Sequence, residues 1–249
     1  VIVEVLGRRG EPGIDTISVV RQYGFPEGFP DAVLDDARRV IQEHDLDEIL
    51  SQREDLRGET IVTIDPDDAR DFDDAISIRK LGDNKYEIGV HIADVSHYVV
   101  PDSALDAEAY RRATSVYLPD RVNPMLPEHI SNELCSLRPN EDKLTFSAIF
   151  QTNENGDVKQ YWLGRTVIHS DHRYTYEDVQ QIIETKEGLH KEEILLLNEM
   201  AQKLRKKRFS KGAINFSSQE VRFQLDEKGV PIGIVVKESK ESHQLIEEF

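Results

Sequence analysis

The stretch TIDPDDARDFDDA, residues 63–75, carries six aspartates within ten residues. Apolar, β-prone residues flank it, IVTI at 61–64 and AISI at 75–78, so the sequence predicts two strands joined by an acidic loop. Carboxylates packed this closely repel one another, and burying one is costly unless an opposite charge neutralises it. Magnesium prefers oxygen ligands and would supply that charge. A solvated acidic loop is the plainer interpretation, but the flanking strands and the stiffening Pro66 favour a metal site.

Two other acidic motifs can be compared with the same residues. An EF-hand loop requires glycine at its sixth position and glutamate at its twelfth. Loops that begin at Asp65, Asp67 or Asp68 have Arg, Phe or Asp at the sixth position and Ile, Ile or Arg at the twelfth, so an EF-hand is excluded. A phosphoaspartyl transferase places its nucleophilic aspartate at the end of an apolar strand. Asp65 meets this condition, but Asp67 lacks the Thr or Val expected after it, so this alternative is weak and stays open.

Four of the aspartates, at positions 65, 71, 73 and 74, fit the spacing TID-x5-D-x-D-D-A. Further blocks follow in order: HIADVS at 91–96, SVYLP at 115–119, PMLP at 124–127 and LCSL at 134–137. With these blocks the chain resembles the RNB family, which contains the ribonuclease II and ribonuclease R exonucleases. The resemblance covers nearly the whole chain. The sequence ARDFDD at 69–74 resembles ribonuclease R more closely than ribonuclease II.

The resemblance implies magnesium-dependent hydrolysis of RNA from a single-stranded 3′ end, with release of nucleoside 5′-monophosphates. Its catalytic and magnesium-binding residues would be Asp65, Asp71, Asp73 and Asp74. Asp65 and Asp74 would hold the main metal ion and Asp71 would help to hold a second, while Asp73 would matter most for the chemical step. Tyr117 would stack on a base near the 3′ end, and a core tyrosine is the alternative. A catalytically inactive member used for binding is the rival function, and the presence of all four aspartates argues against it.

The resemblance also divides the chain. Residues 1–58 correspond to the end of a cold-shock domain, an OB-like β-barrel, and its linker, and residues 59–249 correspond to the N-terminal part of the RNB catalytic domain. The chain is therefore expected to be a fragment. The order of helical and strand patterns predicts an α+β fold with a mixed, mostly antiparallel sheet and packed helices, because the regular βαβ alternation of a Rossmann sheet is missing.

Composition limits the broad class of the protein. Of the 249 residues, 38% are hydrophobic and 32% are charged, which is typical of a globular protein. The apolar runs are too short to span a bilayer, and the single cysteine, Cys135, cannot form an internal disulfide, so we expect a monomer in the reducing cytoplasm and no membrane partner. A net charge of −17 is unusual for a protein that binds RNA. However, a carboxylate site that holds magnesium is locally positive towards a phosphate.

Three other features have ordinary interpretations. Asp94 follows an alternating strand, so a capping or turn residue is favoured over a metal ligand. Cys135 has no basic neighbour in the sequence, which indicates a buried structural thiol rather than a nucleophile. The basic residues of 203–208 end a long helical pattern, so a solvated helix end is favoured over an RNA contact. Asp67 and Asp68 lie outside the family's spacing and are expected on the loop surface.

Periodicity and turn signals predict the remaining elements. Strands are expected at 1–6, 16–20, 61–64, 73–79, 85–94, 144–150, 158–170, 221–225 and 232–237. Helices are expected at 31–44, 46–54, 103–112, 127–137, from 175 through Ile183, at 191–209 and from 242.

Overall fold

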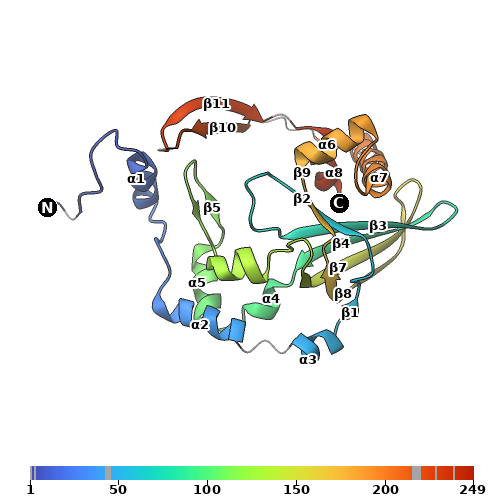
Figure 1. The fold of residues 1–249 in the computed structure, drawn as a ribbon, viewed down its shortest axis with the longest axis horizontal. Coiled ribbons are helices and arrows are strands. Elements are labelled where there is room, and N and C mark those ends of the chain that lie inside the picture. Colours follow the sequence, from blue (N-terminus) through green and yellow to red (C-terminus); the bar gives the residue numbers. More distant parts are fainter. Residues whose placement is uncertain (1, 3, 43–45, 215–219, 228, 238) are drawn as a thin grey trace. The chain divides into compact units, whose positions relative to one another are not determined.

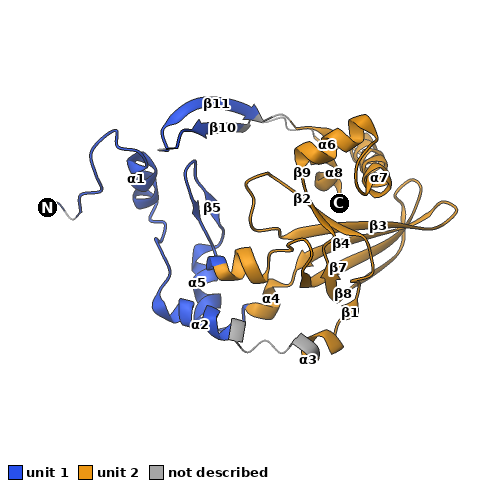
Figure 2. Ribbon diagram, viewed as in Figure 1, with its two compact units in different colours: residues 1–42, 99–128, 217–238 blue, residues 43–98, 129–216, 239–249 orange. Residues whose placement is uncertain are grey.

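A computed structural model describes the chain apart from residues 1, 3, 43–45, 215–219, 228 and 238. It forms two compact units, which are coloured separately in Figure 2. The first unit combines residues 1–42, 99–128 and 217–238, and the second combines residues 43–98, 129–216 and 239–249. Each unit is described by itself. The predicted division at residues 58 and 59 stays a prediction.

The second unit is built on a seven-stranded sheet with the order β1-β8-β7-β4-β3-β2-β9. Its strands are β1 Glu54–Asp55, β2 Ile61–Asp65, β3 Asp74–Gly82, β4 Lys85–Ala93, β7 Asp142–Asn153, β8 Val158–His169 and β9 His172–Thr175. The two outer strands pair in parallel, β1 with β8 and β9 with β2, and every other pair is antiparallel. The predicted α+β fold with a mostly antiparallel sheet is therefore confirmed.

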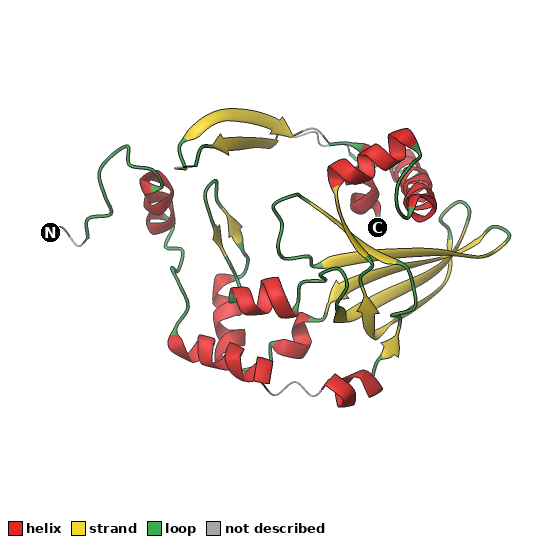
Figure 3. Cartoon of the chain, in the orientation of Figure 1, coloured by secondary structure: helices red, strands yellow, loops and turns green. Residues whose placement is uncertain are grey.

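Helices cover one face of this sheet, as Figures 1 and 3 show for α6, α7 and α8. The helices of the unit are α3 Leu46–Ser51, α4 Val95–Tyr98, the π-helix η1 His129–Leu134, α6 Tyr176–Thr185, α7 Lys191–Ser210 and α8 Glu241–Glu248. Apolar side chains of β2, β3 and β4 meet those of the three long helices in the core: Val62, Ile64, Ile76, Ile78, Ile88, Val179, Ile182, Ile194, Leu197, Met200, Ala201 and Leu245. No described helix has the length and apolar character needed to cross a membrane.

A buried chain of polar side chains crosses the sheet from β3 to β8. His91 lies between the hydroxyls of Ser77, at 3.0 Å from Nε2, and Ser147, at 2.7 Å from Nδ1. Ser147 in turn contacts the hydroxyl of Thr166 at 2.5 Å. Burial lowers the pKa of His91 to about 4, so its ring is neutral near pH 7. A Cβ at Gly89 would stand 2.4 Å from the Ser77 hydroxyl, so glycine leaves the space that this chain requires.

The described residues of the first unit form three helices and two hairpins. Its elements are α1 Ile14–Gln22, α2 Asp31–Gln42, α5 Ala104–Arg112, the pair β5 Val116–Tyr117 and β6 Val122–Asn123, and the pair β10 Glu220–Leu225 and β11 Pro231–Lys237. Ser103 caps α5, since its hydroxyl accepts a hydrogen bond from the Asp106 amide at 3.1 Å. Arg112 is buried and joins two segments, donating to the Pro124 carbonyl at 3.0 Å and lying 3.8 Å from the ring centroid of Phe29.

Some predicted elements differ from the structure. Residues 16–20 belong to α1 rather than to a strand, with Asp15 in the first helical turn, where a negative charge favours a helix, and Val20 buried. No strand forms at residues 2 and 4–6, while Val1 and Val3 lie outside the described residues. The helix expected at 127–137 is the shorter π-helix η1. An OB-like remnant in residues 1–58 stays a prediction.

Candidate active site

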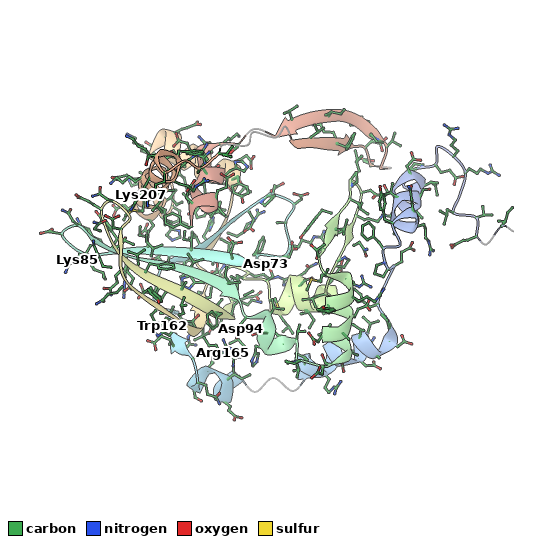
Figure 4. The ribbon with its side chains drawn as sticks, turned by 180° about the vertical axis from the view of Figure 1, so that it is seen from behind. Asp73, Lys85, Asp94, Trp162, Arg165 and Lys207 are labelled. Carbon is green, nitrogen blue, oxygen red and sulfur yellow. The ribbon has the colours of Figure 1, made fainter. Side chains whose placement is uncertain are left out.

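The strands β2 and β3 bring the predicted aspartates to one end of the sheet. They pair antiparallel, with Ile61 opposite Ser77 and Val62 opposite Ile76, and the acidic loop joins them. Asp65 is the last residue of β2 and Asp74 is the first of β3, so both are fixed by backbone pairing. Figure 4 shows Asp73 at this end of the sheet.

The pKa values of these carboxylates are shifted by burial and by the charges of neighbouring carboxylates. Burial and the charge of Asp74 raise the pKa of Asp65 to about 7, and Arg173 partly opposes the shift. Loss of solvation and the charges of Asp71 and Asp74 raise the pKa of Asp73 to about 6, although this residue reaches the surface. Burial also raises the pKa of Asp74. The site therefore holds negative charge that the surrounding protein compensates poorly.

The residues present have the chemistry that a hard divalent cation requires. The Oδ2 atom of Asp65 is buried and has no hydrogen-bond partner among the described residues. An orphaned carboxylate oxygen beside further carboxylates is an environment that an added cation would stabilise. The described residues nevertheless contain no group of three acidic, His or Cys side chains arranged to hold a metal ion. The fold therefore brings carboxylate donors to one end of the sheet, but their side chains are not arranged as a complete set of metal ligands.

The second half of the acidic loop is held by buried backbone and hydroxyl contacts. The Ser136 hydroxyl donates to the Arg70 carbonyl at 2.8 Å and accepts from the Phe72 amide at 3.1 Å. The amide of Leu137 donates to the Phe72 carbonyl, and the amide of Ala93 donates to the Asp73 carbonyl, both at 2.9 Å. These bonds fix the backbone on both sides of Asp71 and Asp73.

The first half of the loop contacts Arg173 of β9. Its guanidinium donates to the Pro66 carbonyl and lies 5.5 Å from the ring centroid of Phe72. Neither Arg173 nor Ser136 was identified from the sequence as a site residue. The block LCSL at 134–137 contained a signal for Ser136, whereas the single arginine within β9 had none.

Asp94 has a role that the sequence did not predict. Its side chain is 1% exposed and accepts hydrogen bonds from Arg53 at 2.6 Å and from the Ser96 hydroxyl at 2.7 Å. Burial alone would raise the pKa of Asp94, but the hydrogen bonds from Ser96 and Arg53 hold it below its usual range. Asp94 is thus a buried ion-pair residue, and its oxygens are already occupied.

The other predicted residues are placed as follows. Tyr117 lies on β5 in the first unit and is 65% exposed, so the alternative of a core tyrosine is wrong. Cys135 is buried, and burial raises the pKa of its thiol to about 12, as expected of a structural thiol. Asp67 and Asp68 are exposed, as predicted.

The basic helix end forms ion pairs within the second unit. Lys203 pairs with Glu199 at 2.7 Å, Lys207 contacts Asp157, and Arg208 donates to Glu248 at 3.0 Å. These contacts support the prediction of an ordinary helix end.

Comparison with known proteins identifies the fold. The family model described as the RNB domain matches residues 53–249 of the chain. Ribonuclease R 2 of Lactococcus lactis is 40% identical over the whole chain, which spans 39% of that protein. Mycoplasma genitalium RNase R, solved in complex with ribose-methylated single-stranded RNA, has a TM-score of 0.91 at 28% identity, covering 98% of this chain and 39% of that one.

A more distant solved structure widens the comparison. Yeast Ssd1, described as a pseudonuclease, has a TM-score of 0.69 at 21% identity over 84% of this chain and 26% of its own, which shows a shared fold alone. The chain spans between 24% and 39% of the length of the curated relatives Ribonuclease R 2 and the DIS3-like exonuclease 2 of Schizosaccharomyces pombe. On the match of its residues 53–249 and its similarity to ribonuclease R proteins, the chain belongs to the RNB family.

Proposed function

We propose that this chain supplies the metal-binding carboxylates of a hydrolytic exoribonuclease that degrades RNA from its 3′ end and releases nucleoside 5′-monophosphates. One observation carries the proposal. In a chain of the RNB family, two paired strands converge on carboxylates whose pKa values are raised by burial and mutual repulsion. Perturbed carboxylates of this kind are typical of functional sites. The relatives named ribonuclease R, and the RNase R solved with single-stranded RNA, support the choice of substrate.

Magnesium is the proposed cofactor. Asp65 and Asp74 would hold the main ion, Asp71 would help to hold a second, and Asp73 would serve the chemical step. A bound ion neutralises charge on the scissile phosphate and acidifies a water molecule. The buried Oδ2 of Asp65, which lacks a hydrogen-bond partner within the described part of the chain, supports this assignment.

The protein's own groups prepare the site for that ion. With a pKa near 7, Asp65 is partly protonated in the metal-free protein at neutral pH, so metal binding would release a proton there. Asp71 and Asp73 flank Phe72, whose amide and carbonyl are both bonded, so the loop backbone cannot rotate freely between them. The exposed ring of Tyr117 would stack on a base near the 3′ end.

The rival function is a pseudonuclease that binds RNA without cutting it. Ssd1, which is described as a pseudonuclease, shares the fold, so this alternative is considered. It is disfavoured because all four motif aspartates are present and their charges are coupled. A phosphoaspartyl transferase is no longer supported, since the chain belongs to the RNB family and Asp67 is exposed. A cytoplasmic location and a monomeric state stay predictions.

The deciding experiment uses a full-length protein, meaning this chain together with the remaining length that its relatives have. It is incubated with 5′-labelled RNA, with magnesium and with a chelator. Progressive shortening from the 3′ end, dependent on magnesium, with nucleoside 5′-monophosphates as the product, is the expected result. RNA binding without any shortening, at saturating magnesium, would support the pseudonuclease instead.

A further inference from the structure

Arg173 contacts both ends of the acidic loop. On one side its guanidinium donates to the carbonyl of Pro66, the first loop residue, and lies 3.9 Å from Asp67. On the other side it faces the ring of Phe72 at 5.5 Å, within the range of a cation–π contact. Loop residues six positions apart in the sequence therefore share a single side chain.

The position of Arg173 is set by the sheet. β9 pairs in parallel with β2, with Thr63 opposite Arg173 and Asp65 opposite Thr175. The side chain of Arg173 is only 20% exposed, and its Nε atom is buried without a hydrogen-bond partner among the described residues. Burying part of a guanidinium is costly, so a compensating interaction is expected, and the loop beside it supplies a carbonyl, an aromatic face and negative charge.

Phe72 connects these contacts to the carboxylates. It lies between Asp71 and Asp73, and its amide and carbonyl are already bonded to Ser136 and Leu137. Its ring is buried and faces the cation of Arg173. Fixing the ring therefore restricts how the flanking carboxylates are directed.

We propose that Arg173 is a positioning residue for the acidic loop: by joining Pro66 to Phe72 it holds the loop in the conformation that allows its carboxylates to bind a divalent cation. The consequence for catalysis rests on the proposed function. The effect on cation binding rests on the proposed metal site, and the effect on loop order rests on neither.

The direction in which cation affinity changes on removal of Arg173 distinguishes the positioning role from a purely electrostatic one. If Arg173 acted only as a nearby positive charge, its removal would strengthen the attraction of the carboxylates for a divalent cation. If it positions the loop, its removal weakens cation binding, as loss of a supporting residue around a metal site commonly does by about tenfold or more. The two roles predict opposite changes.

The test compares the variants Arg173→Met, Arg173→Lys and Arg79→Met in the 249-residue chain. Arg79 is the matched control, because it is an exposed arginine of the same unit that pairs with Glu59 at 2.6 Å and Glu87 at 2.5 Å, outside the loop. Circular dichroism establishes that each variant is folded. Mn²⁺, used as the probe cation, is titrated by calorimetry, and hydrogen–deuterium exchange is followed for the peptide covering residues 66–73 in metal-free protein.

For Arg173→Met we expect a roughly tenfold higher Mn²⁺ dissociation constant and roughly tenfold faster exchange in the loop peptide. Arg173→Lys retains the charge and a donor for Pro66 but lacks the planar face for Phe72, so both effects should be intermediate. Arg79→Met should match the unmodified chain. Unchanged or tighter Mn²⁺ binding, or unchanged loop exchange, in a folded Arg173→Met variant would overturn the proposal.

The result is independent of the exonuclease assay. A full-length protein that never shortens RNA would remove the proposed function and leave the loop measurements interpretable. Conversely, an active enzyme whose Arg173→Met variant keeps its Mn²⁺ affinity would retain the function and remove the positioning role.

Discussion

Two groups of carboxylates in the same unit show opposite electrostatics: Asp94 forms one group, and Asp65, Asp73 and Asp74 form the other. Asp94 is paired with Arg53 at 2.6 Å, and its pKa is lowered. One buried oxygen of Asp65 has no hydrogen-bond partner among the described residues, and the pKa of Asp65 is raised to about 7. Both are aspartates at the end of a strand, so the difference comes from their partners. A compensated carboxylate serves the structure, whereas an uncompensated one is available to an added cation.

The largest expected effect comes from the uncompensated group. Asp73→Asn removes one charge with little change in shape, and should reduce RNA hydrolysis by the full-length protein by about a thousandfold or more while RNA binding persists. Single-turnover hydrolysis and filter binding measure the two properties. Asp68→Asn, an exposed aspartate of the same loop, is the control and should keep normal activity. Near-normal turnover by Asp73→Asn would show that the uncompensated carboxylates are not needed for hydrolysis.

A change to the compensated carboxylate, Asp94, should lower the stability of the folded chain. Asp94→Asn leaves the buried guanidinium of Arg53 without its counter-charge, which typically costs about 3–5 kcal/mol of the free energy of unfolding. Urea denaturation of the chain measures this loss. Asp55→Asn, which affects an exposed pair with Arg57, should cost far less, because solvent screens that pair. Equal losses in the two variants would show that burial of the Arg53–Asp94 pair has no special consequence.

A third variant should have the opposite sign. Asp65→Asn removes a carboxylate whose pKa in the folded chain, about 7, exceeds the ordinary aspartate value of 3.8. The folded state then holds the proton more tightly than the unfolded state, so the charged form lowers stability increasingly from about pH 4 to pH 7 and fully above it. The variant should therefore be more stable than the metal-free parent by roughly 1–3 kcal/mol at pH 8, with no gain near pH 4. Thermal melts at both pH values, with chelator present, measure this difference. A variant that is less stable at pH 8 would contradict the assignment of Asp65 as an uncompensated charge.

The smallest effect is expected for the second arginine near Asp94. Arg165 lies 3.6 Å from that carboxylate, but its side chain is 56% exposed, and Figure 4 labels both residues. Arg165→Met should cost no more than about 1 kcal/mol in urea denaturation. A loss as large as that of Asp94→Asn would mean that Arg165, rather than Arg53, carries the compensation.

The sequence predicted the parts of this arrangement that depend on local pattern. The flanking strands, the acidic loop and the helix predicted from residue 175 all follow from residues close together in the chain, and the structure confirms them. The contacts that distinguish Asp94 from Asp65 are not local. Arg53 lies 41 residues before Asp94, and Arg173 lies 107 residues after Pro66.

Strand pairing decides those distant contacts. Arg173 reaches the loop because the four-residue strand β9 pairs in parallel with β2, and no periodic signal in so short a strand indicates its partner. The helix α1 was missed for a related reason, since β-branched residues at 16–20 favour a strand locally and their helical conformation depends on surrounding contacts. The four aspartates were identified by their spacing, and their individual roles stay predictions.

The neutral imidazole of His91 gives the sheet a natural magnetic-resonance probe. Its ring is enclosed by two hydroxyls, and its backbone pairs with Ala75, the residue next to Asp74. Because its pKa is about 4, its ring resonances should stay constant from pH 6 to pH 8. Any change in its chemical shift on addition of a diamagnetic cation would therefore report a change in the surroundings of the ring, and not a change in protonation.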